Sequence, residues 1–196
     1  MDFGKDLKLI VFDFDGTLHD LKLDWSEARR ILGIAGKDES MGSAIDRLKR
    51  EHHKEPLEAL TELEEQALLR DTLAEDIKET LLDLKKKYKI AIFSRNSSRV
   101  IKEFLKRNGV QLDAIIGREE VNALKPNPEG LVWVMGEFKM TPGNTLLVGD
   151  TWHDLLVARA AGIECVIVGN RFVHDGEEQP EYRIAKITQL SGLLRA

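Results

Sequence analysis

The sequence predicts an α/β protein built on a parallel β-sheet, with an all-helical insert after the first strand. Short apolar runs alternate with amphipathic helical stretches over most of the chain, whereas residues 20–74 contain only helical patterns. The apolar runs are unbroken, which is typical of strands covered on both faces in a parallel sheet. Alternating strands and helices favour right-handed crossovers between neighbouring parallel strands.

Five apolar runs predict buried strands, and four stretches with apolar residues at helical spacing predict the helices between them. Asn127-Pro128 suits an N-cap followed by proline at the first helical position, and Gly109 suits a helix stop because it tolerates a positive φ. The predicted strands cover residues 9–12, 90–93, 114–116, 145–148 and 165–168, and the predicted helices cover residues 75–87, 98–108, 128–139 and 152–161.

The segment 20–74 interrupts this alternation. Helices are predicted over residues 25–32, 41–52 and 57–69, with Gly33, Gly36 and Pro56 between them. We therefore expect a sheet domain formed by residues 1–19 and 75–196 and a small helical domain formed by residues 20–74. The abundant charges of this insert are mixed in sign and predict a solvated face, and Trp25 is expected to be a packing residue.

Length and composition limit the class of protein. The chain has 196 residues, 42% of them apolar and 32% charged, which suits one ordinary domain plus a small insertion. The formal net charge of −5 argues against broad binding to nucleic acid or anionic membranes. The single cysteine, Cys165, lies in an apolar run and predicts an inert thiol.

No apolar stretch reaches the length of a membrane span, and the N-terminal residues lack the charge pattern of a signal peptide. A cytoplasmic protein is therefore expected. Its predicted partner is a small phosphorylated metabolite rather than nucleic acid or membrane, and a monomer and a homodimer are both compatible with the sequence.

Asp13 and Asp15 carry the clearest chemical signal. They follow a buried apolar strand, two residues apart, so both side chains are expected on the same side at its carboxyl end. Open α/β sheets bind their ligands at this edge. Two carboxylates this close repel each other unless a cation, hydrogen-bond donors or a retained proton offset them. The pair therefore suggests a hard metal ion, a nucleophile and an acid/base partner.

Other polar residues with metal- or phosphate-binding groups also lie at or near the ends of predicted strands. Ser94 and Arg95 follow the second predicted strand, Asp150 follows the fourth, and Asp154 comes four residues later. Lys125 lies just before a predicted helix. Because parallel strands bring their carboxyl ends to one edge, these groups could converge there. Carboxylates suit Mg²⁺, and a hydroxyl, a free backbone N–H and a lysine suit a phosphate.

In these residues the chain resembles the haloacid dehalogenase superfamily of aspartate-nucleophile phosphohydrolases. Its four signature motifs occur in order, and although each is weak alone, the four together are specific. The resemblance implies a Rossmann-like sheet with a cap domain, and the insert 20–74 resembles the first cap type of that family. The motifs are Asp13-Phe14-Asp15-Gly16-Thr17, Ser94, Lys125 and Gly149-Asp150-Thr151-Trp152-His153-Asp154.

The resemblance also implies catalytic and metal-binding roles. Asp13 is expected to attack the substrate phosphorus and form an aspartyl-phosphate. Asp15 is expected to protonate the leaving oxygen and then to take a proton from the hydrolytic water. Asp13, the backbone carbonyl of Asp15, and Asp150 are expected to hold Mg²⁺, which neutralises developing charge.

The remaining site residues are expected to bind phosphate or to position other groups. Ser94 and Lys125 would hold the phosphoryl oxygens, and Lys125 would also balance the carboxylates. Thr17 would fix its loop and help to position the phosphoryl group, and the backbone N–H of Arg95 is a further donor. Asp154 would orient Lys125 or a metal-bound water from behind the site, although it could approach the metal directly.

These roles predict a Mg²⁺-dependent phosphatase acting on a small phosphate monoester, and by resemblance alone phosphoglycolate is the first candidate substrate. Within the same fold a dehalogenase is disfavoured, because Asp15 supplies an acid that dehalogenation does not need. A phosphomutase of the beta-phosphoglucomutase type shares the aspartyl-phosphate intermediate and stays open. A non-catalytic phosphate-binding or regulatory protein on this fold would not require the whole constellation.

Substrate choice is expected to depend on the insert. The short cap suggests incomplete coverage of the site and more than one accepted substrate. Its arginines, Arg29, Arg30, Arg47 and Arg50, could meet a substrate carboxylate, although a solvated face is the simpler interpretation. His19 and His153, which follow or interrupt motifs, are candidates for the pocket mouth.

Overall fold

The computed structural model describes residues 6–172 and 179–194, and its centre is a parallel sheet in the order β3-β2-β1-β4-β5-β6. Each neighbouring pair of strands is parallel, so the predicted fold class is confirmed. The strands are β1 (Leu9–Phe12), β2 (Lys89–Phe93), β3 (Ala114–Ile116), β4 (Thr145–Gly149), β5 (Glu164–Val168) and β6 (Tyr182–Ile184).

The edge strand β6 was not predicted from the sequence. It has three residues, of which only Ile184 is buried, so no apolar run marks it. The other five strands match the predicted apolar runs closely. In β1 the residues Leu9 to Phe12 are all 0% exposed, as expected for a central strand covered on both faces.

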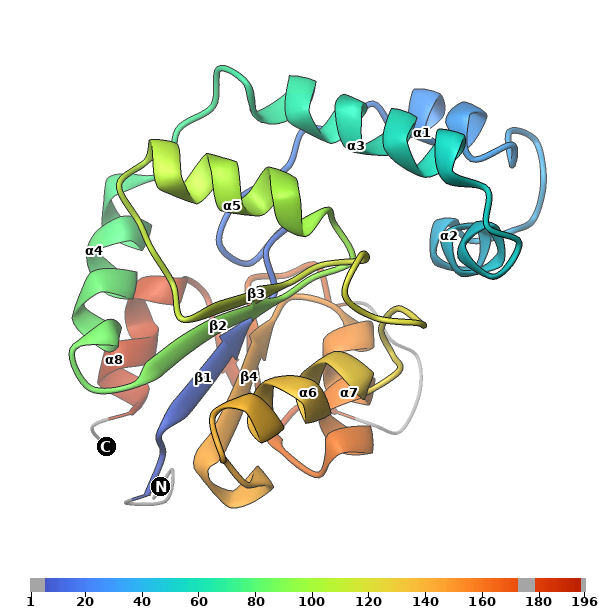
Figure 1. The fold of residues 1–196 in the computed structure, drawn as a ribbon. Helices are drawn as coiled ribbons and strands as arrows, with labels where there is room; N and C mark the ends of the chain where they lie inside the picture. Colours follow the sequence, from blue (N-terminus) through green and yellow to red (C-terminus); the bar gives the residue numbers. More distant parts are fainter. Residues whose placement is uncertain (1–5, 173–178, 195–196) are drawn as a thin grey trace.

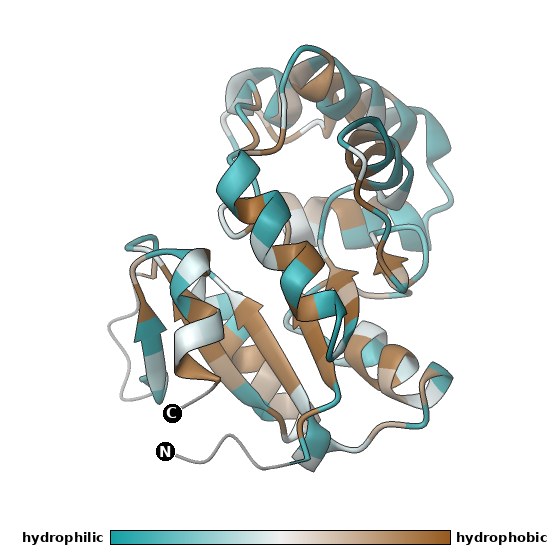
Figure 2. Ribbon diagram, turned by 90° about the vertical axis from the view of Figure 1, so that its left-hand side faces the viewer, coloured by the Kyte–Doolittle hydropathy of each residue, from teal (hydrophilic) through white to brown (hydrophobic). Residues whose placement is uncertain are grey.

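Helices cover both faces of the sheet. Figure 1 shows α4, α5 and α8 on one side and α6 and α7 on the other. Figure 2 shows the hydrophobic residues concentrated along the strands and the sheet-facing sides of these helices. The helices are α4 (Glu75–Lys85), α5 (Ser98–Arg107), α6 (Glu129–Glu137), α7 (Trp152–Ala161) and α8 (Leu190–Leu193), with short 3₁₀ turns at Pro142–Asn144 and Ile187–Gln189.

The insert forms α1 (Trp25–Ile31), α2 (Met41–Arg50) and α3 (Lys54–Leu68), a small helical cap beyond the carboxyl ends of the strands (Figures 1 and 2). α3 begins at Lys54, three residues before the predicted start, because proline at position 56 is tolerated in the first turn of a helix. The domain boundaries at residues 20 and 74 stay a prediction.

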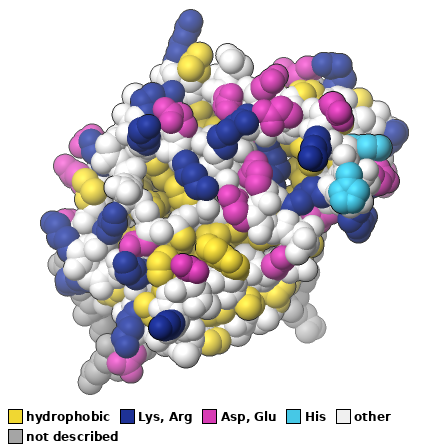
Figure 3. Space-filling view, in the orientation of Figure 1, with side chains coloured by type: hydrophobic (Ala, Val, Ile, Leu, Met, Phe, Trp, Pro, Cys, Tyr) yellow, Lys and Arg dark blue, Asp and Glu magenta, His cyan; other side chains and the backbone are white. Residues whose placement is uncertain are grey.

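The surface carries mixed charge. Figure 3 shows lysine and arginine side chains interspersed with acidic ones over the visible face, with no large patch of a single sign. Cys165 is buried in β5, and burial raises the pKa of its thiol, as expected for an inert core cysteine. Among the described helices, none is both long and apolar enough to cross a membrane.

A buried ion pair ties the helical cap to the sheet. Glu64 of α3 and Arg118, which follows β3, are each only 2% exposed. Arg118 Nη1 donates to both Glu64 oxygens, at 2.8 and 2.9 Å. The side-chain amide of Asn96 and the backbone N–H of Ser97 also donate to Glu64, each at 3.0 Å. The Glu64 charge is therefore well compensated.

A second group of contacts joins α2 to the segment between β3 and α6. The Lys49 ammonium donates to the backbone carbonyls of Arg118 and Val121. The backbone N–H of Leu124 donates to Asp46 Oδ1 at 3.0 Å. Leu124 immediately precedes Lys125, so α2 is hydrogen-bonded to the segment that carries this lysine.

We expect Arg118→Met to lower the free energy of unfolding by about 3–5 kcal/mol, because it leaves Glu64 buried without its cation. Urea unfolding followed by circular dichroism measures this loss. The matched control is Arg99→Met, since Arg99 pairs with Glu58 and Glu65 on the exposed surface and should contribute less than about 1 kcal/mol. Equal effects of the two substitutions would contradict the assignment.

Candidate active site

The turn after β1 places Asp13 and Asp15 at the carboxyl edge of the sheet. Asp13 N–H donates to the Val148 carbonyl at 2.8 Å, which extends the β1–β4 ladder by one residue. Gly16 has a φ of +87°, and a Cβ there would lie 2.1 Å from Asp150 Oδ2. Only glycine therefore lets this turn close against Asp150.

Lys125 lies between two carboxylates. Its Nζ is 2.8 Å from Asp13 Oδ1 and 2.8 Å from Asp154 Oδ1, and its side chain is 2% exposed. The other oxygen of Asp154 accepts hydrogen bonds from the Thr151 N–H at 3.0 Å and the Thr151 hydroxyl at 2.7 Å. Both Asp154 oxygens are thus engaged, and this residue holds Lys125 in place.

Asp150 presents an unsatisfied oxygen. Its Oδ1 accepts from the Thr17 hydroxyl at 3.4 Å, but its buried Oδ2 has no hydrogen-bond partner among the described residues. Carboxylate oxygens of Asp13, Asp150 and Asp154 lie within 4.8 Å of one another. This donor set fits a hard divalent cation. Because Asp154 is already engaged by Lys125 and Thr151, Asp13 and Asp150 are the better placed of the three.

The cluster holds more negative charge than its one ammonium group offsets. Burial raises the pKa of Asp150 to about 7, and the nearby charges of Asp13 and Asp154 add to this effect. Burial likewise raises the pKa of Asp13 and brings that of Asp15 to about 6. Burial disfavours the charged form of Lys125 too, but its two carboxylate partners outweigh this and raise its pKa.

Ser94 enters the same site from the end of β2. It is 1% exposed, and its hydroxyl donates to Asn96 Oδ1 at 3.0 Å. The side-chain amide of Asn96 in turn donates to Glu64 at 3.0 Å. The Ser94 hydroxyl is therefore connected through Asn96 to the ion pair that ties α3 to the sheet.

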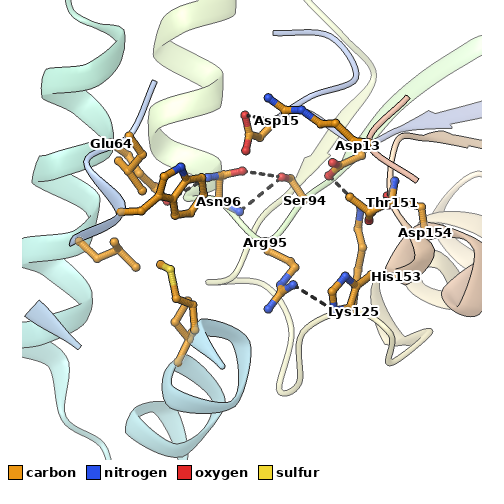
Figure 4. A pocket seen from close by; sticks show the side chains of 16 residues that line it. Asp13, Asp15, Glu64, Ser94, Arg95, Asn96, Lys125, Thr151, His153 and Asp154 are labelled. Carbon is orange, nitrogen blue, oxygen red and sulfur yellow. Dashed lines mark hydrogen bonds and ion pairs between the residues drawn. The ribbon is translucent and has the colours of Figure 1, made fainter. Parts of the chain in front are cut away.

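A cavity of about 330 Å³ opens onto these groups between the sheet edge and the helical cap (Figure 4). The structure brings most of the predicted site residues to its wall: Asp13, Asp15, Ser94, Arg95, Lys125 and Asp154. Thr17 and Asp150 lie behind this wall, in contact with each other. The Thr17 hydroxyl thus meets Asp150 in this structure.

The cap contributes side chains that the sequence did not mark as functional. Leu23, Trp25, Met41, Ile45 and Leu60 line the cavity. The expectation that Trp25 is a packing residue is wrong, because it is 52% exposed and faces the cavity. An aromatic residue that begins an amphipathic helix gives no sign in the sequence of whether it faces a core or a pocket.

Asn96, which comes shortly after the second predicted strand, also lines the cavity. Two polar residues of the wall were missed: Glu64 and Arg171. Arg171 Nη1 lies 3.9 Å from Asp15 Oδ1 and 3.7 Å from Asp150 Oδ2. It follows β5, so its place after a parallel strand was a usable signal. Glu64 had none, because it lies in a run of acidic residues typical of a solvated helix face.

The two candidate histidines lie in different surroundings. His153 lines the cavity and stacks on Trp152, with ring centroids 3.9 Å apart. His19 instead bonds to Asp71 at 3.1 Å and packs against Phe104. Of the two, only His153 contributes to the cavity wall formed by the described residues.

The fold and site define an α/β protein with a cluster of carboxylates around a lysine at the edge of its sheet, and comparison with known proteins identifies the family. Residues 22–168 match the family model of haloacid dehalogenase-like hydrolases. The chain therefore belongs to the haloacid dehalogenase-like hydrolase family.

Relatives in sequence and structure agree with this assignment. A phosphoglycolate phosphatase of Haemophilus influenzae is 27% identical over 95% of this chain and 98% of the relative. A predicted phosphoglycolate phosphatase from Haemophilus somnus superposes with a TM-score of 0.69 at 21% identity, over 96% of this chain and 98% of that chain. CbbY from Rhodobacter sphaeroides in complex with phosphate superposes with a TM-score of 0.71 at 20% identity, over 94% of this chain and 96% of that chain.

We expect Asp150→Asn to stabilise the metal-free protein at pH 8. The pKa of Asp150 is about 7 in the fold against an ordinary value of 3.8. Between these values the folded state holds a proton that the unfolded state releases, so stability falls as pH rises from about 4 to 7. Asparagine does not ionise, so the variant avoids the cost of a buried charge at this position. The free energy of unfolding at pH 8 should therefore rise by about 1–4 kcal/mol.

Urea unfolding in EDTA at pH 5 and pH 8 measures this gain, which should be smaller at pH 5. The matched control is Asp38→Asn in the exposed loop before α2, where no change is expected at either pH. An Asp150→Asn protein no more stable than wild type at pH 8 would contradict the prediction.

Proposed function

We propose that this enzyme is a phosphatase that hydrolyses small phosphate monoesters with Asp13 as the nucleophile. The observation that carries the proposal is the pairing of Asp13 with Lys125 at 2.8 Å at the wall of a cavity that Asp15 also faces. A cation held against a carboxylate lets an anionic substrate approach it.

In the proposed first step, an Asp13 oxygen forms a bond to phosphorus while the bond from phosphorus to the ester oxygen breaks. Asp15 gives its proton to that departing oxygen. In the second step Asp15 takes a proton from water, which attacks the aspartyl-phosphate and releases inorganic phosphate and free Asp13. The Asp15 pKa near 6 suits a group that must both give and take a proton near neutral pH.

Mg²⁺ is the proposed cofactor, held by Asp13, Asp150 and the backbone carbonyl of Asp15. The unsatisfied Asp150 oxygen, the clustered carboxylates and their raised pKa values support this ligand set. When bound, the ion would supply positive charge that offsets the repulsion between a carboxylate and a phosphate.

The phosphoryl oxygens would be bound by the Ser94 hydroxyl, the Lys125 ammonium and the backbone N–H of Arg95. Asp154 would keep Lys125 oriented through their 2.8 Å contact. Thr17 would help to position the phosphoryl group by fixing its turn, and its hydroxyl contact with Asp150 supports this structural part of the role.

The proposed substrate is a small phosphorylated metabolite, and phosphoglycolate is the first compound to test because several sequence relatives carry that name. Residues 20–74 would form the cap that sets substrate choice. Asp15 favours a phosphatase over a dehalogenase. Stoichiometric release of inorganic phosphate distinguishes a phosphatase from a mutase, which returns the phosphoryl group to a sugar.

We expect turnover of small phosphate esters to require Mg²⁺ and Asp13→Asn to lower it by at least about 1,000-fold, because the amide cannot act as nucleophile. Phosphate release from a panel of esters, with Mg²⁺ or EDTA, measures both effects. Circular dichroism should be unchanged, and Asp38→Asn is the matched surface control. Wild-type rates in the Asp13→Asn protein would refute the proposed nucleophile.

Asp15→Asn should slow turnover by about 100- to 10,000-fold and make the phosphoenzyme accumulate, because no group remains to activate the hydrolytic water. Asparagine keeps the oxygen that accepts the Leu21 N–H bond, so the turn should persist. Acid quenching followed by intact-protein mass measurement detects the added phosphoryl group. Undiminished turnover would contradict the acid/base role.

A further inference from the structure

Arg95 places a guanidinium group at the boundary between the sheet edge and the cap. It follows Ser94 directly and lines the cavity. A Cβ added to Gly42 of α2 would lie 1.9 Å from its Nη2, so the guanidinium is pressed against that helix. Figure 4 shows it extending from the chain near Ser94 toward His153 and away from Asp15.

No carboxylate in the described part of the chain forms an ion pair with this guanidinium: burial lowers its pKa, and the more distant charges of Asp13, Asp154 and Asp46 only partly offset this effect. Among the described residues its one hydrogen-bond contact is between Nη1 and His153 Nε2, at 3.4 Å. Burial, and next the Arg95 charge, lower the pKa of His153 to about 4, and the neutral ring accepts from Arg95 through Nε2 when its proton is on Nδ1. A guanidinium has five N–H donors, and most of these remain available to a ligand in the cavity.

The other cations of the wall are already paired. Lys125 contacts Asp13 and Asp154. Arg171 is bonded to Asp20 and lies near Asp15 and Asp150. Arg95 is therefore the cationic group of this wall without an ion-pair partner among the described residues, and its partial burial favours an anionic ligand beside it.

The cap arginines do not offer an alternative. Arg29 donates to the backbone carbonyls of Ile34, Lys37 and Glu39, and Arg30 pairs with Glu27. Arg47 pairs with acidic residues of its own segment. None of these three, nor Arg50, lines the cavity. Unlike these cap arginines, Arg95 therefore has N–H donors available to a second anionic group of a substrate in the cavity.

We propose that the Arg95 side chain is a specificity-determining group that binds a carboxylate on the leaving group of the substrate, with His153 holding the guanidinium in position. This inference rests on the proposed phosphatase function. The planar fork of arginine matches a carboxylate with two parallel hydrogen bonds. Trp25, Met41 and Ile45 would contact the carbon part of the same leaving group.

The test compares esters that differ only in this charge. Phosphoglycolate and phospholactate are each paired with the neutral carboxamide of the same ester, in the presence of Mg²⁺. Arg95→Met should lower kcat/KM about 10- to 100-fold for the carboxylates, mainly through KM, and less than about 3-fold for the amides. Arg95→Lys should recover part of the difference.

The matched control is Arg99→Met, an exposed arginine of α5 four residues further along the chain, which should change neither class of ester. Equal losses for carboxylates and amides would overturn the inference, because the guanidinium would then act on the shared phosphoryl group. No loss for either class would also overturn it. Circular dichroism and thermal unfolding confirm that the variants are folded.

Failure of the proposed function is a separate outcome. If the wild-type protein hydrolyses none of these esters, calorimetry with phosphonopropanoate and propylphosphonate still tests the Arg95 site, since only the first carries the carboxylate. Tighter binding of phosphonopropanoate that disappears in Arg95→Met supports the inference. Equal binding of the two phosphonates overturns it.

Discussion

The rest of the site depends on the buried ammonium of Lys125, held between Asp13 and Asp154. Three buried carboxylates converge there, and without a cation their mutual repulsion would favour protonation. The Lys125 charge offsets part of the repulsion between these carboxylates, but the cluster keeps a net negative charge. Burial and repulsion still raise the pKa of Asp150 to about 7, so a divalent cation bound there would displace a proton below about that pH.

The cap is connected to the same cluster through hydrogen bonds rather than lying loosely above it. Glu64 of α3 binds Asn96, which binds the Ser94 hydroxyl, and Asp46 of α2 binds the residue before Lys125. The residues of the sheet edge that are proposed to bind phosphate are thus one or two contacts from residues of the cap. Arg95 and the apolar cap residues face the same cavity, so the proposed chemistry and the proposed substrate selection share one space.

Much of the fold could be predicted because its central strands are buried on both faces and leave unbroken apolar runs. β6 escaped prediction because an edge strand of three residues needs no such run. The residues of the site were predictable where a motif ends a strand, as at Asp13, Ser94 and Asp150. The wall residues Glu64 and Trp25 were not, because their role follows from contacts between segments distant in the sequence.

The sequence by itself determined the parallel sheet, the helical insert and the set of polar residues delivered to one edge, since each follows from local patterns of burial and spacing. Only the tertiary structure decided which charges find partners. From the sequence alone, Lys125 was also compatible with a solvated surface lysine. Arg95 was predicted to contribute only its backbone N–H to phosphate binding. The turn after β1 and helix α7 bring two carboxylates to the buried Lys125, whereas Arg95 is half-buried beside α2 and faces the cavity. Ion pairing depends on distances that no single segment sets.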